Sequence, residues 1–415
     1  MIHVCFCFHD KKGRYAKFVG TAMFSIFKNT NSEVTVHLLH DNTLTQENRD
    51  KFLELTDHYY HKVKFYNVAE ICSEKLTEYL NLVPSIKTDE RVGIGAFFRL
   101  LIPKVLPSDI EKCIYLDADI IVNLDINDLW QIELGDKPLG VVPECFQSED
   151  RENFIARSME NAIKVYADGF INAEDYFNSG VLLINLKVIG NEEDKIIEGL
   201  KFRNEHPEYG FYDQEVLNYS YASRALKLPV KFNRFVMSAR FDKEYFLEKK
   251  IYHYAGNRDG FGLNMNDPFN KLWMDYFVKT PWFNASTIDN LYEYILKQSE
   301  DYLAQMKKFS ATLSGKTRTF IVNWESLERI KKEFFVRDDE EIIVVAEDSL
   351  NQNLIDKIKS ECEKKVFFGF VSGFPEVLKE EGLLEGEDFF NGFLFFPDVW
   401  RYFKLEDGYQ IIKEM

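Results

Sequence analysis

Two aspartates, Asp117 and Asp119, stand two positions apart in the segment 114–122, with apolar residues on both sides. The apolar flanks indicate a buried backbone, and a buried carboxylate has to be paired with a cation or hydrogen-bonded. Carboxylate oxygens are hard ligands that suit Mn²⁺ or Mg²⁺, ions that also bind diphosphate oxygens. No second strict Asp-x-Asp occurs in the chain. A turn or a helix cap is the alternative interpretation of so short a motif.

His253 is the candidate for a third ligand, because it ends a short apolar stretch and is followed by Tyr254, Ala255 and Gly256. The alternative is a structural histidine, which is the commoner role of a lone one. Gly256 indicates a place where the backbone approaches a ligand closely. Two aspartates with one histidine favour Mn²⁺ over Mg²⁺, because imidazole is the softer donor.

Two further polar segments could contribute to a binding site. Asn178 and Ser179 stand directly before the apolar run 181–184, and Asp213 and Gln214 stand where a helix is predicted to begin. Each segment has a structural interpretation: a turn for the first, and first-turn acids that favour the helix dipole for the second. Taken alone, both segments are explained by those structural roles.

These residues need a frame that brings them together. Hydrophobic periodicity predicts strands at 3–8, 34–40 and 63–68, with helices at 16–28 and from a Thr45 cap to residue 59. This order is typical of a parallel sheet covered on both faces. A further strand at 113–116 ends in Asp117, and ligands collect outside the carboxyl ends of such strands. We therefore expect the Asp-x-Asp pair at a ligand-binding edge.

The rest of the chain continues as alternating strands and helices. Strands are predicted at 139–142, 181–186 and 251–254, and helices at 96–105, 213–221 and 272–278. A change of character near residue 285 predicts two domains, 1–284 catalytic and 285–415 a small helical and α/β domain of unknown role. In the second, helices are expected at 288–306, 354–364 and 375–381, and strands at 320–322, 342–345, 366–370 and 393–396.

Composition excludes some partners. A formal charge of −17 over 415 residues should repel nucleic acid and anionic lipid, so both are excluded as general partners. A phosphate-bearing substrate would then need a bound cation or clustered basic groups. The six cysteines show no metal-type pairing, and we expect buried free thiols in a reducing cytosol. We find no signal peptide or membrane-spanning run, so the protein is predicted to be cytoplasmic, with peripheral membrane association left open.

In this order the segments resemble glycosyltransferase family 8, which includes bacterial lipopolysaccharide galactosyltransferases and glucosyltransferases, and glycogenin. The resemblance covers about residues 1–283. Its motifs are Tyr115-Leu116-Asp117-Ala118-Asp119, Phe177-Asn178-Ser179-Gly180-Val181-Leu182-Leu183-Ile184-Asn185, Asp213-Gln214-Glu215, His253-Tyr254-Ala255-Gly256, Leu272-Trp273 and Thr280-Pro281-Trp282. The fold it implies is α/β: a Rossmann-like nucleotide-sugar-binding domain of GT-A type, a mixed sheet flanked by helices, with the smaller C-terminal α/β unit beside it.

The resemblance implies a retaining transfer of galactose or glucose from a UDP-sugar to a glycan or glycolipid acceptor. Mn²⁺, with Mg²⁺ as the alternative, would be held by Asp117, Asp119 and His253. Catalytic positions would be Asn178, Asp213 and Gln214, and Glu144 would face the acceptor. Retention could follow a same-face attack or a covalent intermediate. The implied donor-contacting residues are His9, Asp10, Arg99, Asp117, Ala118, Asp119, Asn178, Ser179, Gly256 and Arg258. Of these, Asp10 resembles the acidic position that meets uridine, and His9 is the competing choice.

One departure from the family pattern concerns the diphosphate. The family usually carries Lys-Pro-Trp after the His-x-x-Gly, with the lysine on the diphosphate, whereas this chain has Asp259, Gly260 and Phe261. Arg258 stands one position earlier and could replace the lysine, because a guanidinium binds phosphate well. If it does not, the alternatives are a UDP-sugar-binding protein with weak or lost catalysis, or another metal-dependent nucleotide-diphosphate enzyme.

Overall fold

The computed structural model divides the 415-residue chain into two compact units, Met1–Thr287 and Ile288–Met415. The structure describes residues 1–11, 13, 15–87, 94–148, 168–209, 212–239, 247–255 and 267–285 of the first unit, and four strands of the second. The roles assigned to the two predicted domains stay predictions.

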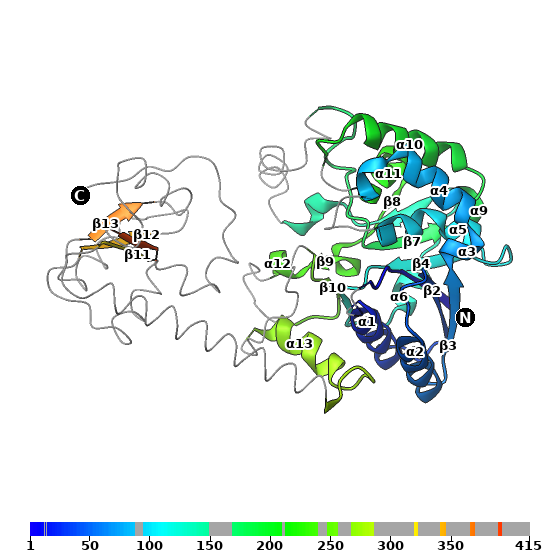
Figure 1. Ribbon diagram of the computed structural model, residues 1–415, viewed down its shortest axis with the longest axis horizontal. Helices are drawn as coiled ribbons and strands as arrows, with labels where there is room; N and C mark the ends of the chain where they lie inside the picture. Colours follow the sequence, from blue (N-terminus) through cyan, green and yellow to red (C-terminus); the bar gives the residue numbers. More distant parts are fainter. Residues whose placement is uncertain are drawn as a thin grey trace. The chain divides into compact units, whose positions relative to one another are not determined.

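A seven-stranded mixed sheet forms the centre of the first unit, with the strand order β3-β2-β1-β4-β7-β6-β8 (Figure 1). Strands β3, β2, β1 and β4 run parallel to one another, and β7 is antiparallel to both β4 and β6. The predicted mixed sheet is confirmed. The strands are β1 Ile2–Cys7, β2 Val34–His40, β3 Lys62–Asn67, β4 Lys112–Leu116, β6 Leu139–Val141, β7 Val181–Asn185 and β8 Leu226–Lys227.

A second, three-stranded sheet adjoins the first, in the order β5-β10-β9. Its strands are β5 Ile120–Val122, β9 Arg234–Phe235 and β10 Ile251–His253. The chain leaves β4 at Leu116 and enters β5 at Ile120, so the Asp-x-Asp segment is the connection between the two sheets. β10 is antiparallel to β5, with His253 opposite Ile120. This register brings the end of β10 to the start of β5.

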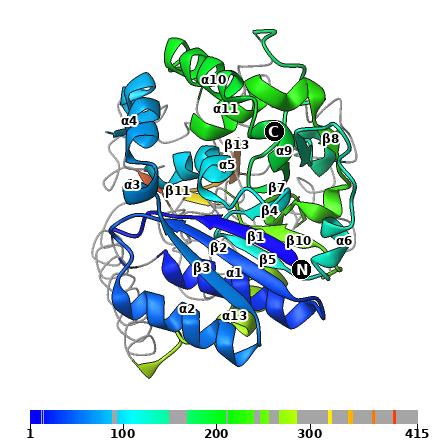
Figure 2. The same cartoon turned by 90° about the vertical axis from the view of Figure 1, so that its right-hand side faces the viewer.

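Helices cover both faces of the large sheet, as predicted. Successive residues of a strand point to opposite faces, and here the residues on both faces are apolar, so both faces need a covering layer. Val4 and Phe6 of β1 pack into one core with helices α1, α2 and α13, whereas Cys5 and Cys7 pack into the other with α4, α10 and α11. Figure 2 shows the two helical layers on either side of the sheet. The long helices are α1 Ala16–Asn29, α2 Gln46–His58, α4 Ser73–Leu82, α10 Glu193–Glu205, α11 Tyr212–Tyr221 and α13 Pro268–Phe277.

Local sequence explains where several helices begin. The Thr45 side chain accepts from the Asn48 backbone N–H at 3.2 Å, which confirms the predicted cap of α2. Helix α13 begins at Pro268, earlier than predicted, because Asp267 caps it and proline suits the first turn. The single helix predicted at 96–105 is wrong in form. It is a 3₁₀ helix, Ile94–Leu101, followed by α5 Ile102–Val105; Pro103 lies in the first turn of α5 and lacks the N–H that a continuous α-helix would bond to the Arg99 carbonyl.

The other predicted strands and helices of the first unit match the structure to within a few residues at each end. Helices α4 and α10 were not predicted. The remaining short elements are α3 Val68–Ile71, α6 Asn127–Trp130, α9 Leu186–Ile189 and α12 Val236–Ala239, with 3₁₀ turns at Pro84–Lys87, Glu144–Gln147, Ala222–Arg224 and Val230–Phe232.

The second unit contains a parallel sheet of order β13-β12-β11-β14. Its strands are β11 Thr319–Val322, β12 Glu341–Val345, β13 Val366–Gly369 and β14 Phe389–Asn391. The first three confirm strands predicted from the sequence. The strand predicted at 393–396 and the helices predicted at 288–306, 354–364 and 375–381 lie outside the described residues.

Two expectations from composition can be compared with the described residues. The cysteines that the structure describes carry free thiols: Cys5, Cys7, Cys72, Cys113 and Cys145. Within the described part of the chain, no helix is both long and apolar enough to cross a lipid bilayer.

Trp282 fastens the last described segment of the first unit to helices α1 and α2. Its ring packs against Gly20, where an added Cβ would lie 2.2 Å from a ring carbon, and its indole N–H donates to Asn48 Oδ1 at 2.8 Å.

Trp282→Ala should lower the free energy of unfolding by about 3–5 kcal/mol, because it empties a buried ring site. Trp282→Phe should lose less, since a ring is retained. Urea unfolding followed by circular dichroism measures both, and equal stability of all three proteins would contradict this packing role.

Candidate active site

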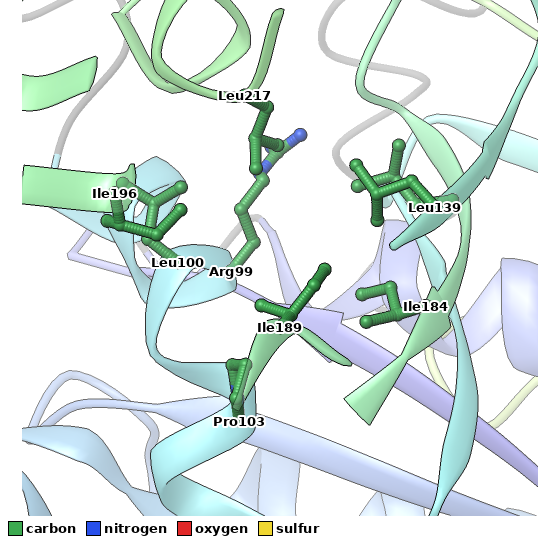
Figure 3. A pocket seen from close by; sticks show the side chains of 9 residues that line it. Arg99, Leu100, Pro103, Leu139, Ile184, Ile189, Ile196 and Leu217 are labelled. Carbon is green, nitrogen blue, oxygen red and sulfur yellow. The ribbon is translucent and has the colours of Figure 1, made fainter. Parts of the chain in front are cut away.

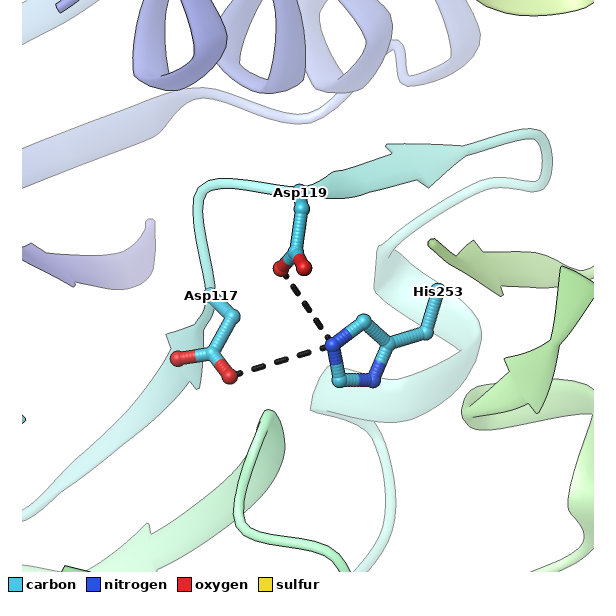
Figure 4. A group of neighbouring side chains, drawn as sticks. All are labelled: Asp117, Asp119 and His253. Atoms are coloured by element: carbon cyan, nitrogen blue, oxygen red, sulfur yellow. Dashed lines mark ion pairs between the residues drawn. The ribbon is translucent and has the colours of Figure 1, made fainter. Parts of the chain in front are cut away.

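The three predicted metal ligands converge where β4 passes into β5. His253 Nε2 lies 3.3 Å from Asp119 Oδ1 and 3.8 Å from Asp117 Oδ2 (Figure 4). The three ligand atoms lie within 4.8 Å of one another. Asp117 directly follows β4, Asp119 directly precedes β5, and the pairing of β10 with β5 supplies the histidine. Strand register therefore brings together Asp119 and His253, which are 134 positions apart in the sequence.

The chemistry of this cluster fits a divalent cation. Nδ1 of His253 faces Asn233 Oδ1 at 3.0 Å, so Nε2 is the ring nitrogen turned towards the carboxylates. Burial lowers the pKa of His253, but Asp119 and Asp117 outweigh it and the pKa is raised. Burial raises the pKa of Asp119, but His253 outweighs it and the pKa is lowered. Two carboxylates that attract positive charge, joined by one imidazole, form a donor set suited to Mn²⁺.

Gly180 makes the close approach of these residues possible. A Cβ added at Gly180 would lie 2.3 Å from His253 Cε1 and 2.8 Å from Asp117 Oδ2. The Gly180 carbonyl accepts from the Asp117 backbone N–H at 2.8 Å, which ties the end of β4 to the start of β7. Any side chain here would push apart the atoms that form the cluster.

Arg99 connects the cluster to a second acidic residue. Its Nη2 lies 2.9 Å from Asp117 Oδ1, and its Nε lies 3.0 Å from Asp213 Oδ2. Nη1 donates to the Ser179 carbonyl at 3.0 Å and to its hydroxyl at 2.9 Å. The Tyr115 hydroxyl donates to the same Asp117 Oδ1 at 2.5 Å, beneath the guanidinium. One oxygen of Asp117 is thus held by Arg99 and Tyr115, and the other is turned towards His253.

The stem of Arg99 borders an apolar pocket on the face of the large sheet that packs against α10 and α11. Figure 3 shows the stem among aliphatic side chains, with its guanidinium at the end far from Pro103. This apolar sleeve fixes the stem, so that the charged end is presented to the carboxylates. The pocket is lined by Arg99, Leu100, Pro103, Leu139, Leu182, Ile184, Ile189, Ile196 and Leu217.

Gln214 is held by its neighbours in one amide orientation. Its Oε1 accepts from Asn178 Nδ2 at 3.0 Å and from the Ser179 backbone N–H at 3.1 Å. Its Nε2 donates to the Tyr176 hydroxyl at 2.8 Å and faces Glu144 Oε1 at 3.4 Å. The predicted positions Asn178, Ser179 and Gln214 therefore lie together, and Glu144 lies at their edge.

Asp213 precedes Gln214 on helix α11 and completes this polar group. Burial raises the pKa of Asp213, although the Arg99 guanidinium opposes that shift. The Ser179 hydroxyl lies 3.3 Å from its Oδ2. Arg99 therefore sets the positions of Asp117 and Asp213 together: Asp117 belongs to the candidate metal cluster of Asp117, Asp119 and His253, and Asp213 lies beside Gln214.

Glu215 is a buried carboxyl group whose importance was not predicted. It is 1% exposed, and its Oε1 accepts from the Tyr176 hydroxyl at 3.0 Å. Burial raises the pKa of Glu215 to about 8, and the Tyr176 hydroxyl only partly offsets this. The carboxyl is therefore neutral at pH 7. Its position next to Gln214 in the Asp-Gln-Glu motif was the available sequence signal.

His9 and Asp10 lie at the carboxyl end of β1. The Asp10 carboxylate accepts from the backbone N–H groups of Tyr15 at 2.7 Å and Ala16 at 3.2 Å, at the start of α1. His9 Nδ1 lies 2.5 Å from Asp41 Oδ2, and this ring is partly exposed. Asp10 thus has a structural role at α1. Contact of either residue with uridine stays a prediction.

The remaining predicted donor residues are placed as follows. Ala118 is buried between the two aspartates, with 5% of its surface exposed. Gly256 and Arg258 lie outside the described residues, as does Asp259. Whether Arg258 takes the place of the family lysine therefore stays a prediction.

Three residues of the site have no local sequence signal of their own. Tyr176 joins Gln214 to Glu215, and Asn218 donates to the Phe177 carbonyl at 2.7 Å, one helical turn after Gln214. Asn233 contacts both His253 and Asn178. Each is polar and buried, and its role follows only from what the fold places beside it.

The family follows from the sequence match that overlaps this site. A model of glycosyl transferase family 8 matches residues 4–258. The chain belongs to glycosyltransferase family 8. The matched region contains the metal cluster, Arg99 and the Asp-Gln-Glu segment, so the motif-based expectation of the family is confirmed.

Known relatives of this family 8 member resemble it over part of their length. A Haemophilus influenzae relative assigned to the glycosyltransferases is 30% identical over 205 residues, which cover 49% of this chain and 55% of that protein. The lipopolysaccharide 1,2-glucosyltransferase of Escherichia coli is 24% identical over 233 residues, covering 52% of this chain and 64% of that one. The chain thus spans less than two thirds of either relative.

The fold of this family 8 member has also been seen in solved structures. The galactosyltransferase LgtC, solved with donor and acceptor sugar analogs, superposes with a TM-score of 0.52 at 20% identity. The match covers 68% of this chain and 96% of that one. The mixed sheet and its helical layers therefore form the GT-A fold.

Gly180→Ala should disrupt the metal cluster without unfolding the sheet, because the new methyl group displaces His253 and Asp117. We expect Mn²⁺ affinity to fall at least about tenfold, as when ligand support is lost. Titration of Mn²⁺ followed by electron paramagnetic resonance measures this. Gly140→Ala on β6 is the matched control, because the three atoms nearest to its new methyl belong to Leu134, Leu183 and Leu228, all aliphatic. Equal Mn²⁺ affinity in the Gly180 and Gly140 variants would contradict this role.

Glu215→Gln should change how stability depends on pH. The folded pKa of Glu215 is raised to about 8 from 4.5, so the unfolded chain loses this proton first as the pH rises. Stability from this group is present below pH 4.5 and is lost between pH 4.5 and about 8, by a few kcal/mol. Glutamine cannot ionise, so the melting temperature of Glu215→Gln, compared with that of wild type, should rise as the pH increases from 5.5 to 8.5. Parallel melting temperatures across that range would contradict the buried, neutral carboxyl.

Proposed function

We propose that the protein is a retaining hexosyltransferase that moves galactose or glucose from a UDP-sugar to a glycan or glycolipid, with Mn²⁺ as its metal. One observation carries the proposal: the buried Arg99 pairs with Asp117 of the metal cluster and with Asp213 beside Gln214. Metal ligands and sugar-side residues therefore belong to one site. Family membership supports glycosyl transfer, and the relative named as a glucosyltransferase supports a hexose.

The cluster of Asp117, Asp119 and His253 would hold the cation. When bound, a divalent cation neutralises the charge that develops on a diphosphate leaving group. Arg99 and Tyr115 hold one oxygen of Asp117, which leaves the other oriented towards the cluster. The Asp119 side chain is 39% exposed, whereas His253 is 2% exposed, so the cluster faces solvent on the Asp119 side. We infer that the diphosphate enters from that side.

On the sugar side, Asp213 and Gln214 supply oxygen atoms beside a positively charged, oxocarbenium-like anomeric carbon. The oxygen of Gln214 already accepts two hydrogen bonds, and Asp213 is paired with Arg99. Both groups are therefore arranged to stabilise charge and not to attack carbon. This favours retention by same-face attack, in which the departing phosphate accepts the proton of the acceptor hydroxyl.

Asp119→Ala and Asp117→Ala should each lower the rate of Mn²⁺-dependent transfer at least about a hundredfold, because each removes a proposed metal ligand. Release of UDP from UDP-glucose or UDP-galactose, with an acceptor sugar and with or without chelator, measures the loss. Circular dichroism should show an intact fold in both variants. Full activity in either variant, together with chelator resistance of the wild type, would refute the metal site.

The same assay separates the alternatives raised by the sequence. Glycosyl transfer releases UDP from the donor, whereas a phosphohydrolase that cleaves the diphosphate of a UDP-sugar releases UMP and a sugar phosphate, and a nucleotidyltransferase releases no UDP. A binding protein that has lost catalysis would show Mn²⁺-dependent thermal stabilisation by UDP without turnover. Neither alternative is favoured by an observation at the site.

A further inference from the structure

Two backbone N–H groups fix the amide orientations at the candidate site. The Gly180 N–H donates to one side-chain atom of Asn178 at 2.9 Å, and the Ser179 N–H donates to one side-chain atom of Gln214 at 3.1 Å. A backbone N–H can only donate, so both recipient atoms have to be oxygens. The nitrogen of Asn178 therefore faces Gln214 Oε1, at 3.0 Å, which is a matched donor and acceptor.

Asn233 extends this constraint to the metal cluster. Its amide lies 3.1 Å from Asn178 Oδ1, and only the nitrogen end of an amide can donate there. The oxygen end of Asn233 therefore faces His253 Nδ1 at 3.0 Å, and Nδ1 has to carry a proton. The other ring nitrogen, Nε2, is then the one presented to Asp117 and Asp119. Bonds of this kind to the far ring nitrogen are how proteins orient metal-binding histidines.

The surroundings of Asn233 hold its side-chain amide in this orientation. Its side chain is 0% exposed, so neither amide end can turn to water. Its own carbonyl accepts from Gln147 Nε2 at 2.6 Å, which anchors the backbone. The neighbouring Phe235 ring meets His253 edge-on, with centroids 5.6 Å apart. The imidazole is therefore held by one polar and one aromatic neighbour from the same short segment.

We propose that Asn233 is a positioning residue that fixes the proton of His253 on Nδ1 and links the metal cluster to the sugar-side amides of Asn178 and Gln214. The metal part of this statement rests on the proposed function, whereas the proton position does not. Hydrogen bonds then run in a single direction, from His253 through Asn233 and Asn178 to Gln214. A change at Asn233 should reach both ends of the site.

Two variants of similar size separate the two ends. Asn233→Leu removes both polar contacts, so we expect Mn²⁺ binding to weaken about 10–100-fold and kcat to fall. Asn233→Asp keeps an acceptor for His253 but places a second acceptor against Asn178 Oδ1. For Asn233→Asp we expect Mn²⁺ binding no weaker than wild type, with kcat still reduced. A residue with only a general structural role would not divide the two measurements in this way.

The proton position is read directly in the metal-free full-length protein. With ¹⁵N-labelled histidine, nuclear magnetic resonance should show a protected Nδ1–H of His253 in wild type and in Asn233→Asp, and should lose it in Asn233→Leu. Asn29→Leu is the matched control. The Asn29 amide binds the Val122 carbonyl at 2.9 Å and the Tyr276 hydroxyl at 2.6 Å, neither of which belongs to a residue of the candidate site. It should lower stability and leave the Nδ1–H signal and the Mn²⁺ affinity unchanged.

The outcomes are distinguishable. An Nδ1–H signal and Mn²⁺ affinity unchanged in Asn233→Leu would overturn the proposal, as would an equal loss in Asn29→Leu. If wild type binds no Mn²⁺ but Asn233→Leu alone loses the Nδ1–H signal, the proposed metal-dependent function fails and the positioning role of Asn233 stands.

Discussion

The rest of the site depends on the two ion pairs made by the Arg99 guanidinium. It is buried between Asp117, at the end of β4, and Asp213, at the start of α11. Without it, the Asp213 carboxylate, 9% exposed, would lack a cation beside it, and an uncompensated buried charge costs several kcal/mol. Its apolar sleeve and the Tyr115 ring fix its direction. The Arg99 side chain therefore links the end of β4, in the large sheet, to the start of α11.

This arrangement also determines what the site still needs. Arg99 is paired with two carboxylates, which largely offset its positive charge. In a chain of net charge −17, two sources of positive charge for the proposed diphosphate are a bound cation and the segment that contains Arg258. The paired oxygens of Asp117 and Asp119 with His253 suit the first source. The proposed metal dependence is consistent with the way the described charges at the cluster are paired.

Backbone atoms give the site its precision. Gly180 lets His253 and Asp117 approach, its carbonyl holds Asp117, and its N–H orients Asn178. Because a backbone group cannot exchange donor for acceptor, side chains attached to it inherit a fixed orientation. Amides that could otherwise flip then transmit that orientation across the site, to His253 on one side and Gln214 on the other. Rigid strands β4 and β7 keep the backbone itself in place.

The sequence by itself determined the alternation of strands and helices, the cap at Thr45, and the Asp-x-Asp pair at the end of a strand, because these are set by neighbouring residues. Motif order supplied His253 and Gln214. It did not give the second sheet, or the roles of Tyr176, Glu215 and Asn233. Those were decided by tertiary structure alone. A buried polar side chain takes its meaning from partners that strand register brings close, and no local pattern encodes that contact.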